Sequence, residues 1–225
     1  DLPMASAQVK PGILLAGLWA AGETSVTEPE PTRDHTERML RAFGYDVKTK
    51  GNRISLQGGG KLVGTEIQVP SDISSAAFFM VGAAITEGSD VTLEAVGINP
   101  TRTGVIEILK QMGADIRVEN ERIAGGEPIA DIRIQGTRTL KGIHMPEDQV
   151  PLAIDEFPAL FIAAACAEGR TVLTGAAELR VKESDRIQVM ADGLKTMGID
   201  CTPTDDGIII EGKGHSGEWG AIFTG

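Results

Sequence analysis

Hydrophobic and polar positions repeat in the same order three times along the chain. Each copy opens with a stretch rich in alanine and other apolar residues, which predicts a helix. These helices are expected to stop at Gly22, Gly88 and Gly169, because glycine relieves the left-handed strain of a helix end. A β-branched run after each glycine predicts a short strand. The three strands are expected at residues 24–27, 91–93 and 171–174.

Each copy continues with a second, amphipathic helix. In the last copy its apolar stripe, which would face a sheet, consists of Ile187, Met190, Leu194 and Met197. The second helices are expected to end at Gly44, Gly113 and Gly198. Short strands such as residues 208–210 close each copy. The pattern predicts an α+β fold of three repeated βαβαββ units, and the uneven spacing of the copies favours separate subdomains over a regular solenoid.

Composition narrows the range of partners. A hydrophobic fraction of 41% argues against disorder, and the net charge of −11 disfavours nucleic acid, although a local cationic cluster can still hold a small anion. The apolar run at residues 12–21 is too short to span a bilayer, so no membrane association is expected. The chain starts at Asp1 and ends in unpatterned, glycine-rich sequence, so both ends are expected to be cut from a longer polypeptide.

The two cysteines indicate neither a metal site nor a disulfide framework. Cys166 and Cys201 lie in separate segments without metal-ligand spacing, and a reducing cytoplasm is the expected location. Cys166 falls in an alanine-rich stripe, which favours a core position over a nucleophile.

The run LRVKESDR carries the most concentrated candidate chemistry. Lys182 and Arg186 are four residues apart, which predicts that they share one face of a helix start. Two cations there oppose the helix dipole, so a bound phosphate or carboxylate would offset them. The alternative is a solvated run of mixed charge, with Glu183 and Asp185 supplying the negative charges.

Two other arginines occupy equivalent places in the earlier copies. Arg33 and Arg102 each follow a threonine, Thr32 or Thr101, that is expected to cap the helix. Repetition of a cation beside a cap in these two copies is hard to explain as chance. Arg33 has the alternative of pairing with an acidic residue of its own helix, Asp34 or Glu37.

The starts of the first helices offer further candidates. Asp155 is expected as an N-cap, and it is also a candidate general base near Lys182. Ser6 is either a cap or a phosphate contact, and Gln8 is an exposed polar residue of the first turn. Lys10 lies one helical turn from Ser6 and would add charge to that site or reach water.

Six segments together resemble one enzyme family. They are ASAQVK, TRDHTE, VPSDISSAAFF, NPTRTG, AIDEFPAL and ELRVKESDR, in this order, and they are similar to the 3-phosphoshikimate 1-carboxyvinyltransferase (EPSP synthase) family. The resemblance implies two lobes, each an enolpyruvate transferase-like prism of three units, so three of the family's six units are present. Residues 1–69 would be the last unit of the first lobe, and residues 70–225 would be two units of the second.

The resemblance also implies a reaction. The family transfers the enolpyruvyl group of phosphoenolpyruvate to the 5-hydroxyl of shikimate 3-phosphate and releases phosphate, without a cofactor. The matching shikimate 3-phosphate contacts are Ser6, Ala7, Gln8, Arg33, Asp155 and Lys182. The matching phosphoenolpyruvate contacts are Gln8 and Arg186. The matching catalytic residues are Asp155, which accepts the hydroxyl proton, Lys182, which steadies developing charge, and Glu183, which exchanges a proton with the methylene carbon.

Several parts of the family pattern are absent from these residues. The N-terminal Lys-Ser-Arg motif, the Gly-Thr loop and the C-terminal Gly-Asp-His-Arg motif do not occur, so the isolated chain is expected to fold but to be inactive without the missing lobe segments. Two alternatives stay open: a UDP-N-acetylglucosamine enolpyruvyl transferase, which shares the fold, and a non-catalytic domain of a larger chain.

Overall fold

The computed structural model describes residues 1–136 and 140–214. The chain forms two compact units. Unit 1 comprises Asp1–Pro70 and Arg122–Ile129, and unit 2 comprises Ser71–Glu121 and Ala130–Gly225. Each unit has a hydrophobic core of its own.

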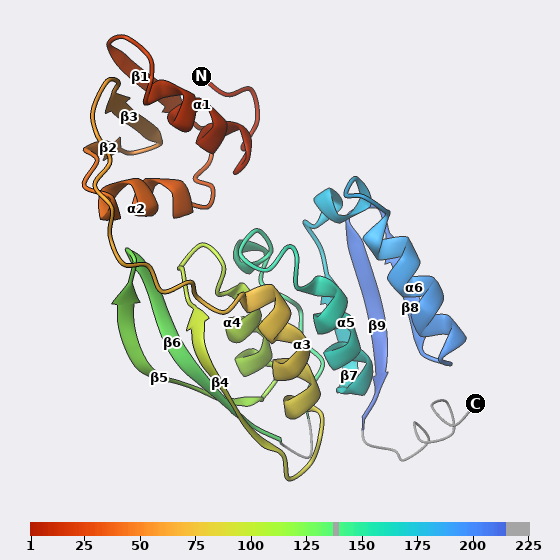
Figure 1. Cartoon of the computed structure of the whole chain (residues 1–225). Helices are drawn as coiled ribbons and strands as arrows, with labels where there is room; N and C mark the ends of the chain where they lie inside the picture. Colours follow the sequence, from red (N-terminus) through yellow and green to blue (C-terminus); the bar gives the residue numbers. More distant parts are fainter. Residues whose placement is uncertain (137–139, 215–225) are drawn as a thin grey trace. The chain divides into compact units, whose positions relative to one another are not determined.

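Unit 1 is a small antiparallel sheet with two helices (Figure 1). Its elements are α1 (Val9–Gly17), β1 (Glu23–Thr27), α2 (His35–Ala42), β2 (Val47–Lys50) and β3 (Arg53–Gln57). The strand order is β1-β3-β2, with Val26 opposite Ile54. Alternate residues of β3, Ile54 and Leu56, are buried because successive side chains of a strand point to opposite faces. With Leu14 of α1 and Leu40 of α2 they form the core of the unit.

Unit 2 contains two further copies of the same element order, except for residues 122–129 of the first of these copies, which belong to unit 1. The first copy consists of α3 (Ile73–Ala84), β4 (Asp90–Gly97), α4 (Gly104–Gln111), β5 (Asp115–Ala124) and β6 (Glu127–Gln135). The second consists of α5 (Phe157–Cys166), β7 (Glu168–Leu173), the 3-10 turn η2 (Ala177–Arg180), α6 (Arg186–Thr196), β8 (Asp200–Thr204) and β9 (Gly207–Lys213). The two sheets have the orders β4-β6-β5 and β7-β9-β8, equivalent to the order in unit 1.

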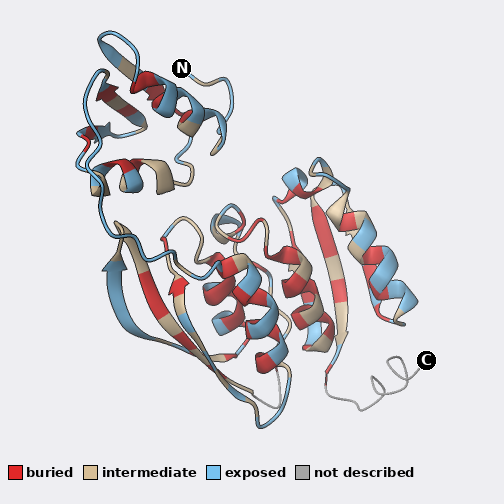
Figure 2. Cartoon of the chain, viewed as in Figure 1, coloured by how far each residue is buried: buried red, intermediate tan, exposed pale blue. Residues whose placement is uncertain are grey.

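The core of unit 2 lies where its helices meet. Helices α3, α4 and α5 lie between the two sheets (Figure 1), and their mutual faces are buried (Figure 2). Both α3 and α5 consist almost entirely of apolar residues, so most of their residues are buried against the sheets and against each other. Phe157 and Phe161 lie one helical turn apart in this core, with ring centroids 5.9 Å apart and ring planes tilted by 31°.

The predicted ends of the second helices are confirmed. Gly44, Gly113 and Gly198 have φ angles of 77°, 96° and 77°, and each lies two residues after its helix, where the left-handed conformation favours glycine. The prediction for the first helices was wrong in position. Gly22 has a φ of 92°, but α1 already ends at Gly17. A further turn separates the two glycines, because the backbone hydrogen bonds after Gly17 join residues three apart, as in a 3-10 helix.

The leading strand predicted for each βαβαββ unit is reduced in the described part of unit 2. It persists there as isolated parallel bridges, which join Ser71 to Val96, Lys141 to Glu168 and His144 to Val172. Among the described residues, every helix is too short or too polar to cross a membrane.

Candidate active site

The run LRVKESDR forms a turn that leads into α6. Helix α6 begins at Arg186, because the Asp185 carboxylate caps it by accepting the Gln188 backbone N–H at 2.9 Å. Arg180 holds this cap in place with a contact of 2.6 Å to Asp185. Lys182 therefore lies in the preceding turn, and the prediction that it shares a helix face with Arg186 was wrong.

Lys182 and Arg186 nevertheless converge on one carboxylate. Asp155 lies in the turn before α5, and its Oδ1 accepts a hydrogen bond from Arg186 Nη1 at 3.2 Å. Lys182 Nζ lies 3.8 Å from the same oxygen. About a quarter of each of the three side chains is exposed, so the cluster is accessible to a ligand. The structure thus brings together three of the residues selected from the sequence.

Glu183 is the fourth member of this cluster. Its carboxylate oxygens accept hydrogen bonds from Arg186 Nε at 2.9 Å and Nη2 at 3.0 Å. This paired bond from Arg186 lowers the pKa of Glu183, and Glu183 in turn raises the pKa of Arg186. Glu183 is therefore ionised at neutral pH in this arrangement.

Nearby carboxylates form ion pairs with both cations of the cluster. Arg186 binds Glu183 and Asp155, while Lys182 contacts Asp155 and also Glu178 of η2. The mixed-charge alternative therefore describes the ligand-free arrangement. An anion that binds here must displace these carboxylates from the cations.

Asp155 is not the N-cap that its sequence neighbourhood predicts. Helix α5 begins one residue later, with Glu156 at the N-cap and Pro158 in the first turn. The Glu156 side chain makes no cap bond to the helix. Instead it is buried and contacts Ser74 and Arg102. Asp155 therefore lies before the cap position, and its carboxylate faces Lys182 and Arg186.

In unit 1, Ser6, Ala7 and Gln8 form the turn that starts α1. Ser6 Oγ accepts the backbone N–H groups of Gln8 at 3.4 Å and Val9 at 3.1 Å, so its expected capping role is met although Gln8 holds the N-cap position. Ser6 and Ala7 are half-buried and Gln8 is exposed. Their polar atoms lie at the surface of a helix start, where anions bind.

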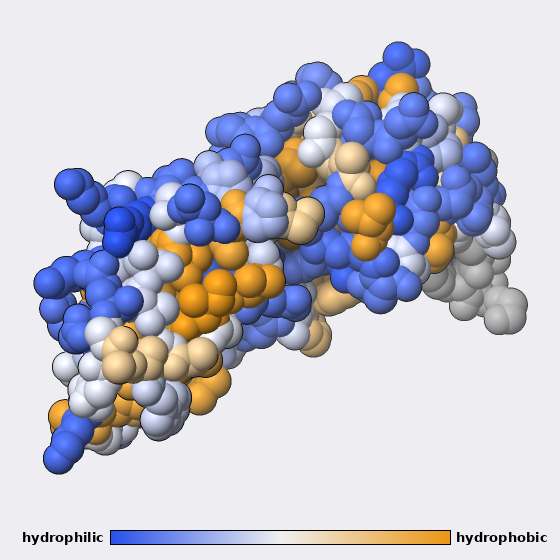
Figure 3. Space-filling model, turned by 90° about the horizontal axis from the view of Figure 1, so that it is seen from above, coloured by the Kyte–Doolittle hydropathy of each residue, from blue (hydrophilic) through white to orange (hydrophobic). Residues whose placement is uncertain are grey.

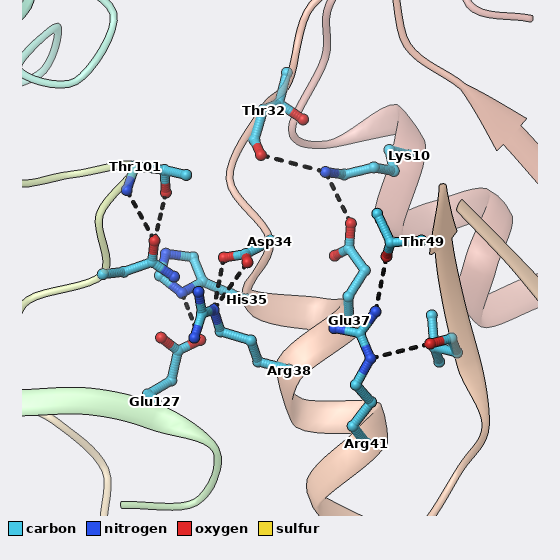
Figure 4. A network of polar contacts seen from close by, with 12 residues as sticks. Lys10, Thr32, Asp34, His35, Glu37, Arg38, Arg41, Thr49, Thr101 and Glu127 are labelled. Atoms are coloured by element: carbon cyan, nitrogen blue, oxygen red, sulfur yellow. Dashed lines mark hydrogen bonds and ion pairs between the residues drawn. The ribbon is translucent and has the colours of Figure 1, made fainter. Parts of the chain in front are cut away.

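Lys10 differs from both of its predicted roles. It is 1% exposed, and its Nζ lies 3.1 Å from Glu28 Oε1, 2.9 Å from Glu37 Oε1 and 3.4 Å from the carbonyl oxygen of Thr32. Figure 4 shows its bonds to Glu37 and Thr32. The lysine lies on the inner face of α1, because that face packs on the sheet and on the loop before α2.

This buried group ties together the two predicted binding segments of unit 1. Lys10 belongs to the helix that Ser6–Gln8 start, whereas Glu28 and Thr32 belong to the loop that carries Arg33. Thr32 donates its hydroxyl to Glu28 and does not cap α2, whose N-cap residue is Asp34. The predicted partners of Arg33 have other contacts: Asp34 binds Arg38 at 2.9 Å, and Glu37 binds Lys10.

Thr101 also differs from the expected cap. Its hydroxyl donates to Asn99 at 2.7 Å, and α4 begins at Gly104 with Thr103 at the N-cap. Arg102 turns inward and is largely buried, with its Nη1 atom 3.2 Å from Asp72. Arg102 was predicted to be equivalent to Arg33, but its contact with Glu156 was not predicted.

The thiols of Cys166 and Cys201 have low reactivity because they are partly or fully buried. Burial raises the pKa of Cys166 to about 11, and it also raises the pKa of Cys201, which donates to the Ala191 carbonyl at 3.5 Å. Cys166 is half-buried, so it lies less deeply than the core position expected from the sequence. In the described ranges we find no group of three or more His, Cys, Asp and Glu side chains arranged to hold a metal ion.

Comparison with known proteins identifies the family. A sequence model described as EPSP synthase (3-phosphoshikimate 1-carboxyvinyltransferase) matches residues 1–222. The chain is 69% identical to the 3-phosphoshikimate 1-carboxyvinyltransferase of Methylococcus capsulatus, over 96% of this chain and 49% of that protein. It is 67% identical to the protein of the same name from Nitrosococcus oceani, over 94% of this chain and 47% of that protein. The chain thus spans about half the length of these curated relatives.

Solved structures confirm the predicted fold. An EPSP synthase structure from Acinetobacter baumannii matches with a TM-score of 0.92 and 92% identity, over 97% of this chain and 49% of that chain. The enolpyruvyl transferase NikO from Streptomyces tendae shares the fold, with a TM-score of 0.66 at 18% identity, over 89% of this chain and 45% of that chain. The α+β, enolpyruvate transferase-like prediction is confirmed, and the chain belongs to the EPSP synthase family.

Proposed function

We propose that this chain supplies part of the active site of an enzyme that transfers the enolpyruvyl group of phosphoenolpyruvate to the 5-hydroxyl of shikimate 3-phosphate. The observation that carries the proposal is the cluster of Asp155, Lys182, Glu183 and Arg186, which combines candidate proton-transfer groups with two cations. Residues 1–69 would belong to one lobe and residues 70–225 to the other. The remaining part of the site would come from lobe segments outside these residues, since the relatives are about twice as long.

Asp155 is the proposed base. A carboxylate that accepts the proton of the 5-hydroxyl makes its oxygen nucleophilic toward C2 of phosphoenolpyruvate. Lys182, 3.8 Å from Asp155, would contact the same hydroxyl and stabilise the negative charge that develops on it. The two side chains therefore act on one oxygen from neighbouring positions.

Glu183 is the proposed acid, and anion binding would make its protonation easier. When phosphoenolpyruvate binds Arg186, Glu183 loses the paired hydrogen bonds from Arg186 that keep its pKa low in the ligand-free arrangement. A protonated Glu183 would donate to the methylene carbon as the shikimate oxygen adds to C2, giving a tetrahedral intermediate. Phosphate then leaves as the methyl group returns a proton, which restores the enolpyruvyl double bond.

Ser6, Ala7, Gln8 and Arg33 are the proposed contacts of unit 1. The hydroxyl and backbone N–H groups at a helix start suit a phosphate oxygen, and Arg33 would add a charged bond to the shikimate 3-phosphate. Gln8 is exposed and would also reach phosphoenolpyruvate. Both cysteines are free, which suits the reducing cytoplasm that we propose as the location.

Turnover with competing acceptors tests the function. The complete reading frame that contains these residues would be supplied with phosphoenolpyruvate and either shikimate 3-phosphate or UDP-N-acetylglucosamine, and phosphate release would be followed. We expect release with shikimate 3-phosphate alone. Release with the nucleotide sugar would favour the other transferase, and the absence of release and of binding with both acceptors would favour a non-catalytic domain.

A further inference from the structure

A buried carboxylate lies next to the proposed base. The Glu156 side chain is 1% exposed, whereas Asp155 beside it is 27% exposed. A buried charge is costly unless it is paired and hydrogen-bonded. The proposed function leaves Glu156 without a role, although it immediately follows the residue that would remove the proton.

Two side chains from the preceding copy hold Glu156. Ser74 of α3 donates its hydroxyl to Glu156 Oε1, and Arg102 Nη2 lies 3.6 Å from the same oxygen. Arg102 Nη2 also donates to Ser74 Oγ at 2.5 Å, which closes a triangle of contacts. Through Nη1 the arginine reaches Asp72 at 3.2 Å, the residue that caps α3. The starts of α3 and α5 and the turn before α4 are joined at this point.

The repeat explains where the members of this cluster come from. Ser74 and Asp155 lie the same number of residues before Gly88 and Gly169, so they occupy equivalent positions in their copies. Each pairs with the arginine at the start of the second helix of its copy, Arg102 or Arg186. In the last copy this pair is accessible, whereas in the middle copy it is turned inward and binds Glu156.

The backbone transmits the position of Glu156 to Asp155. The Glu156 N–H donates to the Ala153 carbonyl at 3.0 Å, and the Glu156 carbonyl accepts the N–H groups of Ala159 and Leu160, both at 3.1 Å. Asp155 is thus held in a short turn. The next residue, Glu156, is fixed by contacts of both its backbone and its side chain. A displacement of about 1 Å at a reacting group can cost a hundredfold in rate.

We propose that Ser74, Arg102 and Glu156 form a clamp that positions Asp155 for proton transfer. The inference rests on the proposed function of Asp155. The three clamp residues are positioning residues, since they act through the turn at 153–156 and not on the substrate. The middle copy therefore contributes to the reaction by holding the base of the next copy.

The test compares kcat and KM of variants in the complete reading frame. We expect Glu156→Ala and Arg102→Met to lower kcat by about 10- to 100-fold, while KM for both substrates changes by less than about threefold. Glu156→Gln keeps an oxygen that accepts from Ser74, and Arg102 keeps its partner Asp72, so kcat should stay within about threefold of the unmodified value. The Glu156→Ala, Arg102→Met double variant should be no slower than the slower single variant, because both changes break one clamp.

Controls separate positioning from loss of folding. Arg133→Met removes an exposed ion pair with Asp90 in the same unit and should leave kcat unchanged. If Glu156→Ala or Arg102→Met fails to fold, Ser74→Ala removes a single hydroxyl and should lower kcat by about three- to tenfold with KM unchanged. Folded variants with unmodified kcat would overturn the clamp, as would a rise in KM at constant kcat or a Glu156→Gln variant as slow as Glu156→Ala. Lack of turnover by the unmodified enzyme would instead contradict the proposed function.

Discussion

Single residues in this chain are defined by the charges around them. Lys10 and Lys182 are both lysines near a helix start, yet one is buried between two glutamates and the other is partly exposed beside Asp155. The difference comes from their positions, because Lys10 lies on the inner face of α1 whereas Lys182 lies in the turn before α6. A lysine therefore stabilises the fold in the first copy, whereas in the last copy a lysine is a candidate catalytic residue.

Removal of the Lys10 charge should destabilise unit 1. Lys10→Met leaves Glu28 and Glu37 buried without their cation, so we expect the free energy of unfolding to fall by about 3–5 kcal/mol. Urea denaturation would measure the change. Lys48→Met removes an exposed lysine and should have little effect. Equal stabilities of the two variants would show that the buried group does not hold the loop.

Cys166 should react slowly with thiol reagents. Its pKa of about 11 means that about one thiol in a thousand is ionised at pH 8, and the thiolate is the nucleophile. We expect alkylation by iodoacetamide to be at least about a hundredfold slower than that of a free thiol, and to accelerate as the pH rises toward 11. Modification of Cys166 at the rate of glutathione, followed by mass spectrometry, would contradict the burial of this side chain.

At the level of the elements, local features are predictable from the sequence, whereas contacts between residues far apart in the chain are not. The glycines that end the second helices and the strand after each first helix follow from local preferences, and the structure confirms them. The burial of Lys10 and the contact of Arg102 with Glu156 were missed because the partners of both residues lie far away in sequence. Thr32 and Thr101 were misjudged as caps because their hydroxyls find acceptors outside the helix.

The candidate site shows the same division. Lys182, Glu183 and Arg186 are adjacent in sequence, so their grouping was predictable. The approach of Asp155 depended on knowledge of the fold, since 31 residues separate it from Arg186. Glu178 was missed as a partner of Lys182, although its spacing of four residues was a usable signal.

The Asp72 cap gives α3 a pH-dependent contribution to stability. Burial alone would raise the pKa of Asp72, but hydrogen bonds from Ser75 and the charge of Arg102 outweigh it and lower the pKa. A carboxyl group with a lowered pKa stabilises the fold above its ordinary pKa of about 4 and loses this effect as the pH falls through the lowered value.

Asp72→Ala should therefore reduce the free energy of unfolding by about 1 kcal/mol at pH 7. The difference from the unmodified chain should shrink as the pH falls below about 4, which denaturation at a series of pH values would measure. Asp72→Asn keeps a capping oxygen and should recover part of the loss. A difference that grows on acidification would contradict the assignment.

At the scale of the whole molecule, large apolar side chains remain exposed. Hydrophobic side chains gather in patches on the face shown in Figure 3. In unit 2 a hollow of about 260 Å³ lies among α3, α5 and α6. It is lined by Phe78, Val81, Gly82, Ile85, Pro158, Ala159, Ile162 and Met190. Contiguous apolar surface of this kind is typical of an interface.

The isolated chain should bind an apolar dye at this hollow. Phe78 is 65% exposed and forms part of the wall, so Phe78→Ser should reduce the fluorescence of bound anilinonaphthalene sulfonate by at least about twofold. Val69→Ser, which changes an apolar residue that is 82% exposed but is not part of the wall, serves as the matched control. Equal dye binding by both variants would show that the hollow is closed in solution.

We propose that Asp155 and its neighbours carry out the proton transfers of enolpyruvyl transfer. The most direct measurement is phosphate release from phosphoenolpyruvate and shikimate 3-phosphate by the complete reading frame, with and without Asp155→Asn. The change keeps the shape of the side chain but removes the base, so we expect kcat to fall by about 10²- to 10⁴-fold while shikimate 3-phosphate still binds. A folded Asp155→Asn variant that turns over at the unmodified rate would contradict this role of Asp155.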